Sequence, residues 1–437
     1  MVNRAGEGRR ARLQTATVAW LSRPLASFHL VLGLCGLLTL LGAVMVLSAS
    51  AASAYDPHTG SGVYGTFYRH LAYIGAGLCA FWAALRTPLP ALRRASPLVM
   101  IVALALLVLV ITPLGVSMDG AQRWFALGPL SLQPVEVAKV ALTLWGAHIL
   151  VIKSRLLRHW RHLLVPVVPA GLLMFALVMA QPNLSGTITL GIVLIALLWF
   201  AGAPKRLFAV LVAGAGVGFL VLALAAQYRL ARVLSFVSGG DASGADYQAL
   251  QAKYALADGG LLGVGLGRGA SKWRYLPNVQ NDFIFALVGE ELGFVGCVVV
   301  LVLFGGVASV GMRIAIRNRD PWIRMVAGTI TVVVVAQAAI NIGYVVNILP
   351  VTGVTLPLIS YGGTSLVVTM FLFGVLAHCA RHEPDAVADL RTLGPGRIGS
   401  LLRLPQPRAA SMATDRHRQP QIARSGTGPA RRPDLRH

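Results

Sequence analysis

Long, uninterrupted runs of apolar residues dominate the chain and are separated by short polar segments. Most runs extend over roughly 18 to 25 residues, the length that an α-helix needs to cross the hydrocarbon core of a bilayer. Because the apolar residues are consecutive and do not alternate with polar ones, the pattern does not fit the strands of a membrane β-barrel. It predicts an all-α, polytopic membrane protein with about ten transmembrane helices. The predicted spans are residues 28–50, 71–86, 96–115, 134–152, 163–180, 184–201, 207–226, 283–308, 325–349 and 364–380.

Basic residues gather in every second polar segment, beginning with the N-terminal one. Cytoplasmic loops of membrane proteins carry an excess of Lys and Arg, so this alternation places both termini in the cytoplasm. An even number of spans is then required, and ten satisfies this condition independently of the apolar pattern. The intervening short segments contain few basic residues, among them Arg69 and Arg123. The basic segments contain Arg4, Arg9, Arg10, Arg12, Arg23, Arg86, Arg93, Arg94, Lys153, Arg155, Arg158, Arg161, Lys205, Arg206, Arg313, Arg317, Arg319, Arg324 and Arg381.

The chain divides into a membrane domain, two basic ends and one large loop. Residues 1–27 form a basic N-terminal segment, residues 28–382 the membrane domain and residues 383–437 a basic tail. The tail is rich in Arg, Pro and Ser, which predicts a disordered cytoplasmic segment. Residues 227–282 lie between the seventh and eighth spans, and a loop of this length can be translocated despite its basic residues. Since it contains apolar and aromatic residues, we expect this extracytoplasmic loop to fold against the membrane domain.

The composition agrees with a membrane protein and argues against a nucleic-acid-binding one. Hydrophobic residues make up 56% of the chain and charged residues 12%, about half the charged fraction of a soluble protein. The net charge of +22 comes mainly from the termini and short loops and not from a binding stripe.

The small residues 48–54 resemble a signal-peptidase site, but the preceding apolar run is long and starts late, which favours an uncleaved anchor. The cysteines lie inside apolar runs without metal-ligand spacing and are expected to be packed thiols: Cys35, Cys79, Cys297 and Cys379.

Polar residues at the predicted outer ends of the spans are the candidates for chemistry, because polar groups inside a membrane are costly and often functional. Arg123 either anchors the chain at the membrane interface or binds an anionic headgroup. Glu136 and Lys139 follow Pro134 at the start of the fourth span, and their i,i+3 spacing places them on one helix face. Either they satisfy each other as an ion pair, or Lys139 contacts a phosphate while Glu136 holds it in place.

A single carboxylate, Asp282, stands where the large loop enters the eighth span. Aspartate is favoured as a helix N-cap, so a structural role is one interpretation. A partly desolvated carboxylate at a membrane edge would also suit a general base. Glu290 and Glu291 follow in the same span, and a buried glutamate there needs a partner, for which Lys139 is one candidate.

Three further segments are rich in turn-forming residues. Residues 181–187 predict a tight outer turn. Residues 349–365 contain two prolines, three glycines and several hydroxyl groups but no charge, a composition typical of a re-entrant or cavity-lining segment. The glycine-rich stretch 263–269 lacks the G-x-G-x-x-G spacing and the flanking strand and helix of a nucleotide site. No Walker motif occurs, so ATP is not the energy source on this chain.

In these segments and in their order, the sequence resembles the SEDS family of shape, elongation, division and sporulation proteins, represented by FtsW and RodA. The resemblance covers about residues 25–385 and rests above all on LPxxxxDFIFAxxGEELG at 276–293 and LPxTGxxLPxISYGG at 349–363. Residues 145–148, 341–345 and 380–384 look most like the actinobacterial division branch of this family.

The resemblance implies a peptidoglycan glycosyltransferase that polymerises lipid II, a disaccharide-pentapeptide on undecaprenyl pyrophosphate, for septal cell-wall synthesis in cell division. Asp282 would be the general base for the attacking sugar hydroxyl, and undecaprenyl pyrophosphate would leave. The family's conserved Arg, Glu and Lys match three positions of this chain, to which we add two motif residues as candidates. The substrate-binding candidates are thus Arg123, Glu136, Lys139, Gln280 and Ser360.

The resemblance also implies partners and a location. A class B penicillin-binding protein transpeptidase and other division proteins are the expected partners, and the plasma membrane at the division septum is the expected place. No cofactor is implied, and a divalent cation that bridges the pyrophosphate stays open. Three positions depart from the family pattern: Gln280 for a frequent His, Val135 for the usual Ser, and Asn183 for an acidic residue. These departures argue against a metal-binding or relay role there and leave Asp282 untouched.

Two alternatives from other functional classes stay open at this point. A lipid II flippase would suit a ten-helix protein with intramembrane charges and no nucleotide site. A division scaffold would leave the chemistry to a partner. Asp282 discriminates between them, because only an enzyme requires this carboxylate for polymer formation.

Overall fold

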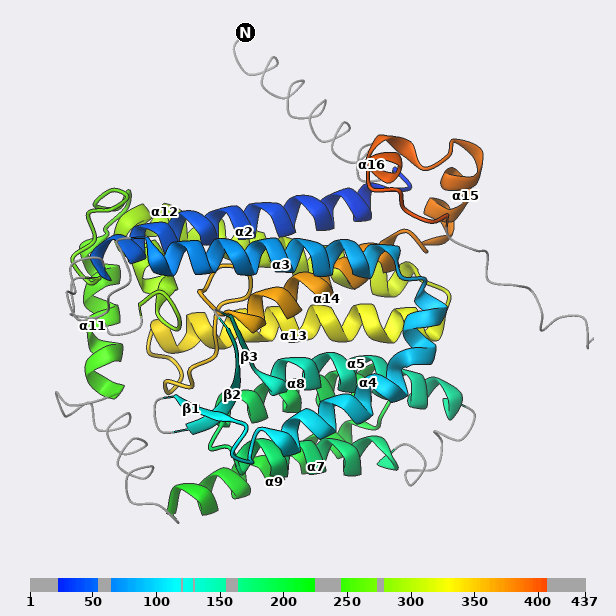
Figure 1. Cartoon of the computed structure of the whole chain (residues 1–437), viewed down its shortest axis with the longest axis horizontal. Helices are drawn as coiled ribbons and strands as arrows, with labels where there is room; N and C mark the ends of the chain where they lie inside the picture. Colours follow the sequence, from blue (N-terminus) through cyan, green and yellow to red (C-terminus); the bar gives the residue numbers. More distant parts are fainter. Residues whose placement is uncertain are drawn as a thin grey trace, which may run out of the picture. The chain divides into compact units, whose positions relative to one another are not determined.

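A computed structural model of the chain describes residues 23–53, 64–118, 121–128, 130–154, 164–224, 245–272 and 279–406. Within them, ten helices correspond to the ten predicted spans and form a bundle (Figure 1). They confirm the all-α class. These helices are α2 (Ala26–Ser53), α3 (Gly65–Arg86), α4 (Leu89–Leu109), α5 (Pro134–Ile152), α7 (Val167–Met179), α8 (Leu184–Phe200), α9 (Lys205–Leu224), α12 (Ile284–Arg317), α13 (Pro321–Val345) and α14 (Thr364–Ala380).

Among the described helices, α2, α4, α5, α12 and α13 are individually long and apolar enough to cross a membrane. A sixth span is added if α14 is counted together with α15 (Pro384–Thr392), to which it is bent by 73°. The apolar helices α7 and α8 are shorter. Large apolar side chains such as Leu98, Ile101 and Val302 are 64–66% exposed. An apolar exterior of this kind suits a bundle whose surroundings are lipid.

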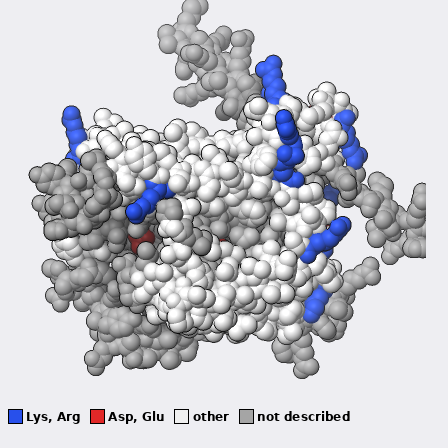
Figure 2. Space-filling view, in the orientation of Figure 1, with Lys and Arg blue, Asp and Glu red and all other residues white. Residues whose placement is uncertain are grey.

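Charged side chains separate the two ends of the bundle from its middle. We call one end the basic end, because α2, α4 and α13 begin there and α3, α12 and α14 end there, next to the predicted basic segments (Figure 1). Figure 2 shows most of the visible Lys and Arg side chains toward this end and a wide uncharged band beside it. The opposite end, the cavity end, carries Arg69, Arg123 and a small sheet. The described Lys and Arg residues of the basic end are Arg23, Arg86, Arg93, Arg94, Lys153, Lys205, Arg206, Arg313, Arg317, Arg319, Arg324, Arg381, Arg391, Arg397 and Arg403.

Proline and polar caps explain where several helices begin. Pro134 and Pro321 occupy the first turns of α5 and α13, where the missing N–H would have had no helical partner. Asp320 caps α13 by accepting from an amide of its first turn at 2.8 Å. Asn183 caps α8, because its Oδ1 accepts from the Gly186 amide at 2.9 Å. The turn predicted at 181–187 therefore also starts a helix.

The sheet at the cavity end was not predicted. Its antiparallel strands β1 (Val116–Met118), β2 (Ala121–Leu127) and β3 (Leu130–Leu132) lie in the order β1-β2-β3. The third span, predicted to reach residue 115, ends at Leu109 instead. Pro113 and Gly115 follow, and the residue before a proline is driven out of the helical region. The apolar residues beyond Leu109 thus belong to a turn and a strand, not to the span.

The loop and tail segments differ in how well they were predicted. In the large loop, α11 (Ala245–Asp258) packs against α12 and α13, as expected for a loop that folds on the membrane domain. Residues 384–401, predicted to begin a disordered tail, instead form α15 and α16 (Gly396–Leu401). Ala386 and Leu390 of α15 are buried, so apolar packing orders this stretch. The remaining tail residues 407–437 and the N-terminal residues 1–22 lie outside the described residues.

Candidate active site

A cavity of about 570 Å³ lies among α3, the sheet, α5, α8, the entry of α12 and the α13–α14 loop. Its volume is within the range of sites that hold small molecules or headgroups. Three sequence-predicted residues line it: Arg123, Glu136 and Asp282. The polar lining as a whole comprises Arg69, Tyr73, Arg123, Ser131, Gln133, Glu136, Ser185, Thr189, Asn281, Asp282, Gln337, Thr355, Tyr361 and Ser365.

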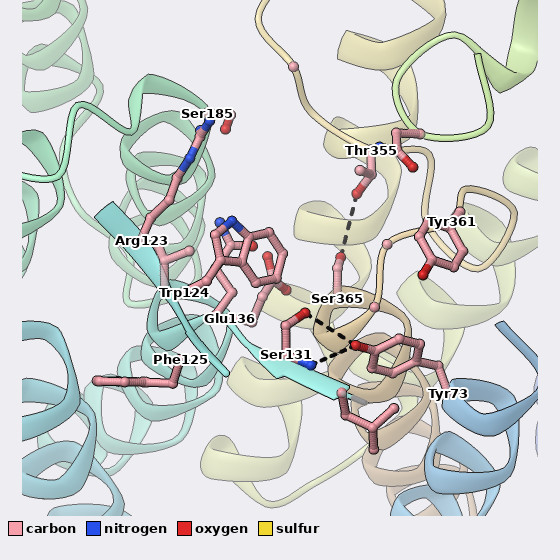
Figure 3. Close-up of a pocket in the computed structure, with 18 of the residues that line it drawn as sticks. Tyr73, Arg123, Trp124, Phe125, Ser131, Glu136, Ser185, Thr355, Tyr361 and Ser365 are labelled. Carbon is pink, nitrogen blue, oxygen red and sulfur yellow. Dashed lines mark hydrogen bonds between the residues drawn. The ribbon is translucent and has the colours of Figure 1, made fainter. Parts of the chain in front are cut away.

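Arg123 projects from β2 and is available to an anion. Its Nε is buried and has no hydrogen-bond partner among the described residues. In Figure 3 the side chain extends from the strand toward Ser185. Because a buried guanidinium N–H without an acceptor is unfavourable, this position suits a carboxylate or phosphate oxygen from a ligand. The geometry favours headgroup binding over the interpretation of Arg123 as an interfacial anchor.

Glu136 and Lys139 form the predicted ion pair in the first turns of α5. Lys139 Nζ lies 2.7 Å from Glu136 Oε2, and the two side chains are 2% and 10% exposed. Only Glu136 lines the cavity, and Lys139 lies behind it. Removing one member of a buried pair leaves an uncompensated charge. Lys139 therefore supplies the opposite charge that Glu136 faces at the cavity wall.

Asp282 lies in the cavity lining, half-buried, immediately before α12. The N-cap of α12 is Phe283, without a side-chain cap bond. Asp282 therefore does not occupy the N-cap position, which was one interpretation of the sequence. A Cβ on Gly353 would lie 3.4 Å from Asp282 Oδ2, so the carboxylate sits against the α13–α14 loop at a glycine with φ 73°.

Two buried side chains of α13 fix the backbone at Asp282. The Tyr344 hydroxyl is 2.7 Å from the Asp282 carbonyl oxygen and 2.8 Å from the Val354 carbonyl oxygen. Asn341 Nδ2 donates toward the same two carbonyls at 2.9 and 2.8 Å. Both side chains are fully buried. This Asn341–Tyr344 clamp joins the entry of α12 to the α13–α14 loop and restricts where the Asp282 carboxylate can lie.

The loop 346–363 between α13 and α14 lines the cavity, as its composition predicted. Gly353, Val354, Thr355 and Tyr361 are among its lining residues. Burial raises the pKa of the Tyr361 phenol, Tyr73 raises it further, and the charge of Arg69 opposes both effects. Tyr361 is thus kept as a neutral hydroxyl at the wall.

Gln280 and Ser360 do not line the cavity. The Gln280 carbonyl accepts from the Tyr361 amide at 2.9 Å, and Ser360 Oγ accepts from the Leu356 amide at 2.9 Å. Both contacts shape the protein around the cavity. A direct contact of either side chain with substrate stays a prediction.

Neutral hydroxyl groups that sequence reasoning missed hold the sheet to the bundle. The Tyr73 hydroxyl accepts from the Ser131 amide at 2.8 Å and lies 3.2 Å from Ser131 Oγ, as Figure 3 shows. Thr364 Oγ1 donates to the Ser131 carbonyl and accepts from the Gln133 amide at 3.2 Å. Arg69 also lines the cavity. One signal in the sequence pointed to Arg69, because it is an isolated basic residue in the first predicted outer segment. None pointed to the hydroxyl residues.

The partners predicted for the glutamate pair require a correction. Glu291 pairs with Lys272 at 2.9 Å and not with Lys139. The large loop reaches these side chains because it folds back onto α12.

The departure of Asn183 from the family pattern has a simple structural account, since an asparagine oxygen caps α8 as an aspartate oxygen would. All four cysteines are free thiols, but the prediction that they are packed holds only in part: Cys35 and Cys379 are buried, Cys297 is partly buried and Cys79 is exposed.

Comparisons with known proteins agree with this arrangement. A family profile described as a cell cycle protein, FtsW/RodA/SpoVE, matches residues 28–385. The chain is 45% identical over 399 residues to the probable peptidoglycan glycosyltransferase FtsW of Mycobacterium tuberculosis, covering 91% of this chain and 76% of that protein. It is 36% identical over 350 residues to stage V sporulation protein E of Bacillus subtilis, covering 79% of this chain and 95% of that protein.

Solved structures show the same fold. One, described as "Structural coordination of polymerization and crosslinking by a peptidoglycan synthase complex", superposes with a TM-score of 0.69 at 26% identity, covering 81% of this chain and 97% of that one. The rod shape determining protein RodA of Thermus thermophilus superposes with a TM-score of 0.60 at 27% identity, covering 81% and 96%. The sequence match extends from α2 to the start of α15 and includes every residue of the cavity.

Proposed function

Because the chain belongs to the FtsW/RodA/SpoVE family of cell cycle proteins, we propose that it is a peptidoglycan glycosyltransferase that polymerises lipid II. Its relatives in Mycobacterium tuberculosis and in Synechocystis are named as probable peptidoglycan glycosyltransferases. The observation that carries the proposal is the meeting of Asp282 and Arg123 in one cavity. A base for a sugar hydroxyl and a cation for a departing pyrophosphate are the two groups that this transfer needs.

The reaction forms one glycosidic bond and breaks one bond to phosphate. The 4-hydroxyl of the acceptor N-acetylglucosamine attacks the anomeric carbon at the lipid-linked end of the growing chain. Asp282 accepts the hydroxyl proton as the new C–O bond forms. The bond between the anomeric carbon and the phosphate oxygen breaks, and undecaprenyl pyrophosphate leaves with the bonding electrons.

The other lining residues have roles that follow from their charge and position. Arg123 stabilises the developing charge on the pyrophosphate, because its buried Nε lacks an acceptor among the described residues. Glu136, held by Lys139 at 2.7 Å, accepts hydrogen bonds from sugar hydroxyls. Tyr361 and Ser365 offer neutral hydroxyl groups to the same ligand. Whether a divalent cation takes part in holding the pyrophosphate is an open question.

The orientation and the partner belong to the same proposal. The basic end faces the cytoplasm, with both termini, so the cavity opens on the outer side, where lipid II is polymerised. A class B penicillin-binding protein is the proposed partner at the division septum. The fold likeness to a solved peptidoglycan synthase complex supports this partner.

The test is polymer formation from purified components. The protein is purified with its transpeptidase partner, supplied with lipid II, and assayed for glycan strands on a gel beside Asp282→Ala at matched thermal stability. We expect polymer from the wild type and none from the variant. Polymer from both would refute Asp282 as the base. If lipid II crosses liposome membranes and no polymer forms, the protein is a flippase and the glycosyltransferase proposal fails.

A further inference from the structure

The glycine-rich segment 259–269, which carries no nucleotide motif, packs against a break in α12. Gly293 interrupts this helix with φ 70° and ψ −167°, a conformation that L side chains rarely adopt. A break leaves backbone N–H and C=O groups without helical partners, and in a membrane protein such groups must be satisfied by other protein atoms. The glycine-rich segment supplies these partners.

Four backbone hydrogen bonds join the segment to both sides of the break. After the break, the Phe294 amide donates to the Gly260 carbonyl at 2.9 Å, and the Val295 amide donates to the Leu261 carbonyl at 3.2 Å. Before the break, the Val264 amide donates to the Glu290 carbonyl at 2.9 Å, and the Gly265 amide donates to the Glu291 carbonyl at 3.1 Å. The large loop therefore completes α12.

Small residues are required for this close approach. A Cβ on Gly263 would overlap the Glu291 carbonyl, and a Cβ on Gly259 would overlap the Gly289 carbonyl. Gly267 in the same segment has nearly the same φ as Gly263, 81° against 82°, but a Cβ there would meet nothing within 4 Å. The two glycines thus share a positive φ and differ in their contact with α12.

Buried side chains lock the same contact. Glu291 accepts from Ser48 Oγ of α2 at 2.7 Å and pairs with Lys272 Nζ at 2.9 Å. The Lys272 and Glu291 side chains are 1% and 0% exposed. Glu290 accepts from the Ala270 amide at 2.6 Å and from the Ser271 amide and hydroxyl. We call the contact of Ser48, Lys272 and Glu291 the loop lock.

The loop lock and Asp282 stand at opposite ends of one short helical segment. Residues 284–291 are all buried, and Asp282 precedes them by two residues. A hydrogen-bonded helix transmits displacement along its axis, because its residues are fixed relative to one another. The clamp of Asn341 and Tyr344 holds the Asp282 end, and the loop lock holds the Glu291 end.

We propose that the loop lock and the glycine-rich segment position Asp282 for the transfer step. Lys272 and Glu291 are then positioning residues, which act on the substrate only through the segment 284–291. This inference rests on the proposed role of Asp282 as the base. A small shift of a base relative to its reacting hydroxyl lowers turnover more than it lowers substrate binding.

The test compares matched variants of the full chain in complex with its transpeptidase partner. We expect Gly263→Ala to lower kcat for lipid II polymerisation by about tenfold or more, while KM changes by less than about twofold and Gly267→Ala stays near wild type. Lys272→Met should lower kcat like Gly263→Ala, and Lys272→Arg, which keeps the cation, should restore most of it. Hydrogen exchange of the amides in 279–292 should speed up in the two impaired variants only.

Each outcome decides between the two proposals. Wild-type kcat in Gly263→Ala and Lys272→Met would overturn the positioning role, even if polymer formation still requires Asp282. A rise in KM without a fall in kcat would also overturn it. If the wild type forms no polymer, the proposed function fails. Exchange at 279–283 that stays unchanged when Gly263 or Lys272 is altered would then separately refute the mechanical link.

Discussion

At the scale of single residues, the candidate site consists of a few charged groups among many neutral ones. Arg123 and Asp282 stood out in the sequence because a charge at the edge of an apolar run is rare and costly. Tyr73, Ser131 and Thr364 did not, because neutral hydroxyls are common in membrane segments and their value depends on which backbone groups they meet. Glu291 was noticed in the sequence, but Lys139 was the wrong partner for it. The actual partner, Lys272, lies in the large loop, whose fold cannot be derived from local pattern.

Arg123 should contribute mainly to the stabilisation of the leaving group. We expect Arg123→Gln to lower kcat/KM for lipid II by about 100-fold, because a buried charge-assisted contact in an active site is removed. Steady-state polymerisation kinetics measure this effect. The control is Arg397→Gln at the basic end, where the side chain is exposed and the rate should be unchanged. An Arg123 variant as active as this control would remove the cation from the mechanism.

The Asn341–Tyr344 clamp makes a separate prediction. Tyr344→Phe removes one hydroxyl that bridges the carbonyls of Asp282 and Val354. We expect a loss of about 1–2 kcal/mol in the free energy of unfolding, because buried acceptors lose a donor, together with a reduced kcat. Thermal unfolding in detergent and polymerisation assays measure the two effects. Tyr254→Phe, at an exposed tyrosine of α11, is the matched substitution that should change neither quantity.

At the scale of elements, apolar run length predicted which helices exist but not all of their ends. The third span was predicted to end six residues too late, at residue 115 and not at Leu109, because Val110 to Gly115 are apolar enough to extend the run while Pro113 prevents the helix. The break in α12 lies inside one predicted span, where Gly293 looked like one of many membrane glycines. The cavity-lining role of 349–365 could be predicted, because an uncharged segment rich in proline and glycine cannot be a regular helix.

The start of α8 tests how much one cap contributes. Asn183 Oδ1 accepts from the Gly186 amide at 2.9 Å, so Asn183→Ala should destabilise the protein by about 1 kcal/mol. Asn183→Asp keeps the acceptor and should be neutral or slightly stabilising, because a negative charge suits a helix N-terminus. The shift of the thermal unfolding midpoint in detergent measures both. Equal midpoints for the two variants would mean that the cap contributes nothing to stability.

At the scale of the whole molecule, the alternation of basic segments predicts orientation, and the bundle separates the two kinds of segment. We expect a cysteine at Tyr64, at the cavity end, to react with a membrane-impermeant thiol reagent in intact cells. A cysteine at Arg319, at the basic end, should react only after permeabilisation. Both side chains are exposed, and Cys79→Ala removes the exposed native thiol. The reverse labelling pattern would place the cavity on the cytoplasmic side and contradict the proposed function.

The central claim is that this cavity binds lipid II and that Asp282 acts on the bound substrate. The most direct measurement is lipid II affinity and single-turnover polymerisation on the same preparations of wild type and Asp282→Asn, each in complex with the transpeptidase. Asparagine keeps the shape of the side chain and removes its basicity. We predict that the variant binds lipid II within about threefold of the wild-type affinity but forms glycan at least about 1,000-fold more slowly. A variant that binds equally well and polymerises at the wild-type rate would contradict the account.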